Sequence, residues 1–167
     1  MKKNFIIYIF CAISSLNIGC FYSFTGASVN PNIKTVTVNY FENKAENINP
    51  SLSTTLTEKL KDIFSSQTNL SIEKNNGDLE FSADIMSYTI LPVDIQSNQL
   101  ANKNRMTISI KVKFTNIMEE GANFHTTFKR FRDFQSTANL SQIEEELISD
   151  ICDELIEDIF NKAMVNW

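Results

Sequence analysis

Residues 105–117 read RMTISIKVKFTNI, and this stretch decides the fold. Apolar side chains occupy every second position from Met106 to Phe114, and polar or basic side chains occupy the positions between them. Because successive side chains of a strand point to opposite faces, the alternation predicts a long β-strand with one buried face and one polar face. Such a strand needs a sheet around it and a layer that covers its apolar face.

The segments on either side supply further strands. Glu119-Glu120-Gly121 predicts a turn into a second strand, Asn123 to Phe134, so that these two strands form a hairpin. Upstream, Leu79 to Pro92 begins with the same alternation, and Lys34 to Phe41 is a shorter strand with one buried face. A short extended piece is expected at Leu70 to Ile72.

Two segments carry the signals of helices. Asn49-Pro50 offers an N-cap side chain and a proline at the first helical position. Ser141-Gln142-Ile143-Glu144 has the pattern of a capping box, in which Ser141 is the N-cap. Apolar residues follow both signals at helical spacing, which predicts two amphipathic helices.

The element order is therefore strand, helix, several strands, helix. Two amphipathic helices against the apolar face of the sheet would satisfy every apolar stripe. The sequence predicts an α+β fold, a two-layer sandwich with two helices packed on one face of a mixed, mainly antiparallel sheet of about four strands. The other sheet face would be polar and open, or covered by a partner. The connection Asp94 to Asn104 has no pattern, and we expect it to be mobile.

The N-terminal residues predict export and lipid attachment. A basic tip precedes an apolar run, and small residues ending in Gly19 lead to Cys20. In bacterial lipoprotein processing, the thiol of such a cysteine takes a diacylglycerol and the signal peptide is cut before it. The alternative is an uncleaved signal anchor, for which the run is short because crossing the hydrocarbon needs about 20 apolar residues.

We therefore expect three parts. Residues 1–19 would be a lipoprotein signal peptide, residues 20–33 a lead-in anchored through Cys20, and residues 34–167 a single domain. The residue after Cys20 is Phe21, not the aspartate that retains lipoproteins at the inner membrane, so we expect an outer-membrane protein that faces the periplasm.

The charge balance bears on the partners. Without Lys2 and Lys3, the chain has 13 basic residues against 20 acidic ones, a net charge of −7. A domain this acidic is a poor general binder of nucleic acid, and we expect no nucleic-acid partner.

Catalytic and metal sites have little support. His125 is the only histidine and is interpreted as structural, and the chain has too few glycines for a phosphate loop. No cluster has metal-ligand spacing, and no cofactor is indicated. Cys152 lies among apolar residues at helical spacing and is expected to be a small core residue rather than a reactive thiol. The acidic face of the last helix is interpreted as a solvated surface rather than a cation site.

The predicted hairpin is a local basic region. Arg105, Lys111 and Lys113 share one parity, so they project from one side of their strand. Lys129, Arg130 and Arg132 lie on the next strand, where Lys129 cannot share a face with the two arginines without a bulge. One interpretation is a contact for a phosphorylated or carboxylated glycolipid. The other is an ordinary solvated strand face on which lysine discourages edge pairing.

Several stretches together resemble the LptE family of lipopolysaccharide-assembly lipoproteins, and the resemblance covers nearly all of the chain after the signal peptide. The stretches are Cys20 to Ser28, Asn39 to Asn43, Asn49 to Ser53, Asn76 to Leu79, Asn104 to Thr107, Asp158 to Ala163 and Asn166-Trp167. No single motif is diagnostic, but the order and spacing of these stretches are fairly specific.

The resemblance implies a periplasmic outer-membrane lipoprotein with helices on a sheet. Its partner would be the β-barrel protein LptD, whose lumen family members plug and whose assembly they assist, and the pair would move lipopolysaccharide to the outer leaflet. The resemblance also implies lipopolysaccharide binding through basic residues near strand ends. The assignment of Arg105, Lys111 and Lys113 as the lipopolysaccharide contact rests on the local pattern of this chain.

Two other functions remain open from the sequence. The protein could be an auxiliary ligand-binding lipoprotein of another envelope transporter, because small sandwiches of this kind serve several roles and fold alone does not decide function. An enzyme acting on envelope glycans would need an acid/base pair, and the sequence offers none that is placed for it.

Overall fold

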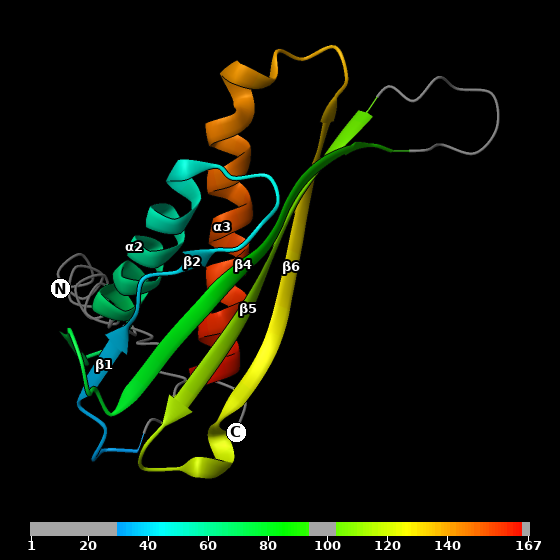
Figure 1. Ribbon diagram of the computed structural model, residues 1–167. Coiled ribbons are helices and arrows are strands. Elements are labelled where there is room, and N and C mark those ends of the chain that lie inside the picture. Colours follow the sequence, from blue (N-terminus) through cyan, green and yellow to red (C-terminus); the bar gives the residue numbers. More distant parts are fainter. Residues whose placement is uncertain (1–29, 94–102, 165–167) are drawn as a thin grey trace, which may run out of the picture.

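A computed structural model describes residues 30–93 and 103–164 (Figure 1). The strands are β1 (Thr35–Val38), β2 (Glu42–Asn43), β3 (Ser71–Glu73), β4 (Leu79–Pro92), β5 (Lys103–Asn116) and β6 (Phe124–Gln135). The helices are α2 (Pro50–Gln67), the 3-10 turn η1 (Glu120–Ala122) and α3 (Leu140–Met164). The predicted signal peptide, the lipid site Cys20 and most of the Asp94 to Asn104 connection lie outside the described residues.

The sheet is mixed, as predicted. Its strand order is β3-β1-β4-β5-β6, with β2 beside β4. The three long strands β4, β5 and β6 are antiparallel neighbours, whereas β1 runs parallel to β3 and β4, and β2 runs parallel to β4. The sheet has six strands rather than about four, because the two short strands β2 and β3 add to β1 and to the three long strands that the alternation predicts.

Both helices lie on the same side of the sheet (Figure 1). Their apolar stripes meet the inward side chains of β4 and β5, and the centre of this layer is a row of phenylalanine rings. Phe64 of α2 contacts Phe81 of β4 and Phe160 of α3, with ring centroids 5.2 Å apart in both pairs. Phe81 in turn contacts Phe114 of β5 at 4.7 Å. The predicted two-layer α+β sandwich is confirmed.

The two helices begin differently. The Asn49 side chain accepts a hydrogen bond from the backbone N–H of Ser51, and Pro50 is the first residue of α2, as predicted. The predicted capping box of the second helix is wrong. Helix α3 begins at Leu140, and the N–H of Ser141 donates to the side chain of Asn139.

Glu144, the other member of that predicted box, joins three elements instead. One of its carboxylate oxygens accepts hydrogen bonds from the Tyr88 hydroxyl (2.7 Å) and from the Asn49 amide (3.0 Å). Burial together with the hydrogen bond to Glu144 raises the pKa of Tyr88 well above its usual value. The start of α3 is therefore fastened to β4 and to the N-cap of α2.

A close backbone approach fixes the end of β1. Gly77 lies so near this strand that a Cβ atom there would be 2.7 Å from the Thr37 nitrogen, and the Gly77 N–H donates to the Thr37 hydroxyl (2.9 Å). The next residue, Asp78, accepts hydrogen bonds on one carboxylate oxygen from the N–H groups of Lys34 and Thr35 and from the Thr35 hydroxyl. These three hydrogen bonds are the main reason that the pKa of Asp78 lies below its usual value.

Candidate functional site

The side of the sheet opposite the helices is polar, and none of the described helices covers it (Figure 1). On β5 the outward positions run from Arg105 to Thr115 at every second residue, as predicted from the sequence. On β6 their cross-strand neighbours are Asp133, Phe131, Lys129, Thr127 and His125. The predicted basic region of the hairpin is therefore divided between two faces of the sheet.

Arg105 is on the open face but already has partners. Its guanidinium donates two hydrogen bonds to the Asp133 carboxylate, at 2.6 and 2.9 Å, and lies over the Phe131 ring, 3.8 Å from the centroid. The hydrogen bond raises the pKa of Arg105 and lowers that of Asp133. A two-pronged ion pair of this kind is a strong and directional contact. Any ligand of Arg105 would therefore have to compete with Asp133.

Arg130 and Arg132 point the other way, toward α3. Arg130 donates to Asp158 (2.7 Å), and Arg132 donates to Glu154 (2.7 Å). The hydrogen bond from Arg132 lowers the pKa of Glu154. These pairs fasten β6 to the helix layer, so both arginines have a structural role. They also show that part of the acidic face of α3, which is interpreted from the sequence as a solvated surface, binds β6.

Three lysines remain on the open face: Lys111 and Lys113 on β5 and Lys129 on β6. Lys111 and Lys113 are two residues apart on one strand, which places their Cα atoms about 7 Å apart. Lys129 is diagonal to Lys111, because Lys111 pairs with Thr127, and such diagonal neighbours are about 7–8 Å apart. We call these three residues the lysine cluster. Each is exposed, and none makes an ion pair with a residue of the described ranges.

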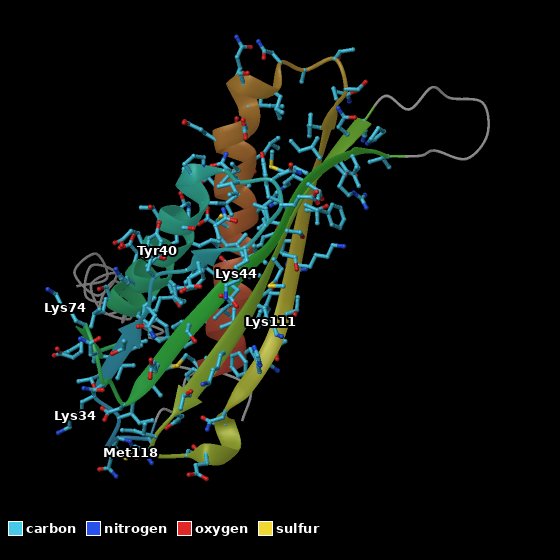
Figure 2. The ribbon with its side chains drawn as sticks, in the orientation of Figure 1. Lys34, Tyr40, Lys44, Lys74, Lys111 and Met118 are labelled. Atoms are coloured by element: carbon cyan, nitrogen blue, oxygen red, sulfur yellow. The ribbon has the colours of Figure 1, made fainter. Side chains whose placement is uncertain are left out.

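The nearest carboxylate across the sheet already has a partner. Asp84 of β4 is the cross-strand neighbour of Lys111, but its carboxylate binds the Lys44 amine at 2.8 Å. Figure 2 labels Lys44 and Lys111 over the middle of the sheet. The lysine cluster therefore keeps its charge available to solvent on a face that also carries hydroxyls, among them Ser82 and Thr127.

His125 flanks this cluster. It is exposed on β6, directly across from Lys113, and its position in a strand agrees with the sequence prediction. Cys152, in contrast, is fully buried in α3, as predicted, and burial raises the pKa of its thiol to about 12. A thiol of this kind stays protonated at neutral pH and is unreactive.

The arrangement suits the binding of an anion better than a chemical step. Lysine amines are compact positive charges with three donors each, and hydroxyl neighbours can add hydrogen bonds to phosphate or carboxylate oxygens. Among residues 30–93 and 103–164, no group of histidine, cysteine and carboxylate side chains could hold a metal ion. Within the same ranges, neither helix has both the length and the apolar composition of a membrane span.

Comparison with known proteins decides the family. The family model described as LptE, lipopolysaccharide-assembly, matches residues 33–163, which is most of the chain. The chain belongs to the LptE family. Its members are lipopolysaccharide-assembly lipoproteins, so this LptE protein is a lipoprotein of the bacterial envelope with a role in lipopolysaccharide assembly. Among curated proteins, no sequence matches the chain.

Solved structures share the fold of this LptE protein at low sequence identity. A minor lipoprotein from Acinetobacter baumannii is 15% identical with a TM-score of 0.53, over 80% of this chain and 94% of that one. Lipoprotein B from Nitrosomonas europaea is 11% identical with a TM-score of 0.50, over 76% and 79% of the two chains. A hypothetical protein from Chlamydia trachomatis is also 11% identical with a TM-score of 0.50, over 80% and 98%.

The sequence predicts the basic strand but not how its residues divide between the two faces of the sheet. Arg105, Lys111 and Lys113 share one parity in the sequence, and the structure places all three on one face, as predicted. The pairing of Asp133 with Arg105 depends on the register between β5 and β6, which the sequence does not predict. The same register places Lys129 diagonal to Lys111. The sequence indicates only that Lys129 cannot share a face with Arg130 and Arg132.

Proposed function

We propose that this LptE protein is an outer-membrane lipoprotein, anchored through an acylated Cys20 on the periplasmic side, that plugs an LptD-type β-barrel and assists its assembly. Together the two proteins would move lipopolysaccharide to the outer leaflet. The family match supports the role in lipopolysaccharide assembly, and the shape and surface of the fold support the finer assignment.

The fold suits a plug in two respects. Its two layers share one aromatic core, which makes a small and rigid body. Its open sheet face is rich in hydroxyls and charges, which matches the polar interior of large outer-membrane barrels. A plug needs no active site, and the role of the lysine cluster would be to bind an anionic ligand rather than to catalyse a reaction.

The observation that carries the ligand assignment is the set of unpaired amines at Lys111, Lys113 and Lys129. We assign Lys111 and Lys113 to the phosphate or carboxylate groups of lipopolysaccharide, with Lys129 as a third contact. Arg105 would contribute at the far end of the same face. There its partner Asp133 also lies near the positive charge of Lys103. Charge-assisted hydrogen bonds of this kind are the strong ones.

The test compares two matched double variants. Lys111→Gln with Lys113→Gln removes two charges from the lysine cluster. Lys34→Gln with Lys74→Gln removes two charges from the other edge of the sheet, beside β1 and β3, away from the lysine cluster (Figure 2). We expect the first variant to lose about tenfold in affinity for purified lipopolysaccharide and the second to lose little, because the contact is local rather than a matter of net charge. Equal losses in the two variants would return Lys111 and Lys113 to an ordinary solvated strand face.

A further inference from the structure

The turn after β5 exposes two consecutive apolar side chains. Ile117 is 58% exposed and Met118 is 48% exposed, although the core strand that they follow is fully buried on its inner face. Single exposed apolar residues are common on protein surfaces. Two in succession at the tip of a hairpin form a small apolar projection, which we call the apolar turn.

The apolar turn is held in place by its own hydrogen bonds. The side-chain oxygen of Asn116 accepts from the N–H groups of Met118 (2.9 Å) and Glu119 (3.1 Å). The Asn116 N–H donates to the side chain of Asn123 at 2.6 Å, across the base of the turn. With its backbone fixed in this way, the turn keeps Ile117 and Met118 outward rather than folding them onto the core.

The same end of the molecule receives the N-terminal part of the chain. The Ile117 N–H donates to the Asp78 carbonyl (3.0 Å), while the Asp78 carboxylate accepts from the Lys34 N–H (2.8 Å). Asp78 therefore ties the apolar turn and the start of β1 to one point. Figure 2 labels Lys34 and Met118 close together at this end.

The number of residues between Cys20 and Asn30 limits how far the start of the described domain can lie from the lipid anchor. Ten residues lead from Cys20 to Asn30, where the description begins. Since an extended chain spans at most about 3.5 Å per residue, Asn30 lies within about 35 Å of an acylated Cys20. The end of the molecule that carries the apolar turn is thus the end at which the tether joins the domain.

We propose that, in the lipidated protein before it enters a barrel, the apolar turn rests on the lipid bilayer that holds the acyl anchor, with Ile117 and Met118 in the interfacial layer. Glu119 and Glu120 follow directly and are exposed, so the contact is shallow, at the level of the headgroups. The anchor and the turn would then act as two contacts that orient the molecule, with the far ends of β4 and β5 directed away from the membrane surface. This inference rests on the proposed acylation of Cys20.

The test measures the depth of a label at the turn. A Met118→Cys variant of the lipidated protein, reconstituted in phosphatidylethanolamine-rich vesicles, is labelled with an environment-sensitive fluorophore and quenched by nitroxide-bearing lipids. Cys152 is buried and unreactive, and Cys20 carries the lipid, so the label reports on one site. The matched control is Leu91→Cys. Leu91 lies at the other end of β4, and its side chain is 62% exposed.

We expect quenching at position 118 to exceed that at position 91 at least about twofold, because only the turn reaches the interfacial layer. Adding Ile117→Ser to the labelled Met118→Cys variant should lower the quenching toward the value at position 91. Equal quenching at the two positions, or no effect of Ile117→Ser, would overturn the proposal. Recovery of a barrel partner by the unlabelled protein is a separate measurement, so a failure here leaves the plug assignment standing.

Discussion

At the residue scale, the two turn glycines Gly77 and Gly121 differ in whether the structure has room for a Cβ atom. Gly77 is required by the close approach of its backbone to Thr37, whereas nothing lies within 4 Å of a Cβ at Gly121. The sequence marks both positions as glycines in turns and cannot distinguish them. The difference arises from the parallel pairing of β1 with β4, which brings segments more than forty residues apart into contact.

We predict that Gly77→Ala destabilises the fold by about 1–3 kcal/mol, because the added carbon overlaps backbone atoms of β1. The matched variant Gly121→Ala should change the free energy of unfolding by less than about 0.5 kcal/mol. Urea unfolding of both variants measures this. Two similar, small effects would show that β1 can move away from Gly77.

Asp78 gives a prediction about pH. Its pKa is lower in the folded state than in the unfolded chain, so it stabilises the fold above its unfolded pKa, and this contribution is lost as the pH falls through the folded value. Below about pH 4, the usual carboxyl range, the wild-type protein should therefore lose more stability than Asp78→Asn does. Urea unfolding at a series of pH values tests the difference. Parallel curves for the two proteins would mean that Asp78 makes no such contribution.

At the scale of elements, the alternation of β5 and the spacing of the helices were sufficient to predict the layers. The fault in the predicted capping box has a physical cause. Asn139 is also a good N-cap residue, and choosing it starts α3 at Leu140 and leaves Glu144 free to bind Tyr88 and Asn49. Local sequence offered two caps, and a tertiary network selected between them.

We expect Tyr88→Phe to destabilise the protein by about 1–2 kcal/mol, because the buried side of Glu144 loses a charge-assisted hydrogen bond. Hydrogen exchange should show faster opening at the first turn of α3. Thermal unfolding of the variant provides the free energy. A stability equal to that of the wild type would indicate that water replaces the hydroxyl at no cost.

The edge strand β6 provides a test of the arginine contacts. A double-mutant cycle of Arg130→Ala and Asp158→Ala should give a coupling energy of about 0.2–1 kcal/mol, since both side chains are partly exposed. The single variants should also make the amides of β6 exchange faster. A coupling energy of zero would mean that β6 is held by its apolar side chains alone.

At the scale of the whole molecule, many charged side chains are paired, whereas Lys111, Lys113 and Lys129 lie together on the open sheet face. Carboxylates of α3 bind the arginines of β6, and carboxylates of the open sheet face bind Arg105 and Lys44, which leaves the lysine cluster without such a partner among the described residues. The sequence predicted an acidic protein with a basic hairpin. It could not predict which basic residues remain unpaired, because that depends on the packing of α3 against β6 and on the register of β6 against β5.

The central claim, that this LptE protein works as the plug of an LptD-type barrel, has one direct test. The lipidated protein is recovered by affinity from mildly solubilised outer membranes, and the proteins bound to it are identified and quantified. We expect a large LptD-type barrel in near-equal amount, and we expect the Lys111→Gln and Lys113→Gln double variant to retain it, because the lysine cluster is assigned to the ligand. Recovery of a different transporter, or of no partner, would contradict it.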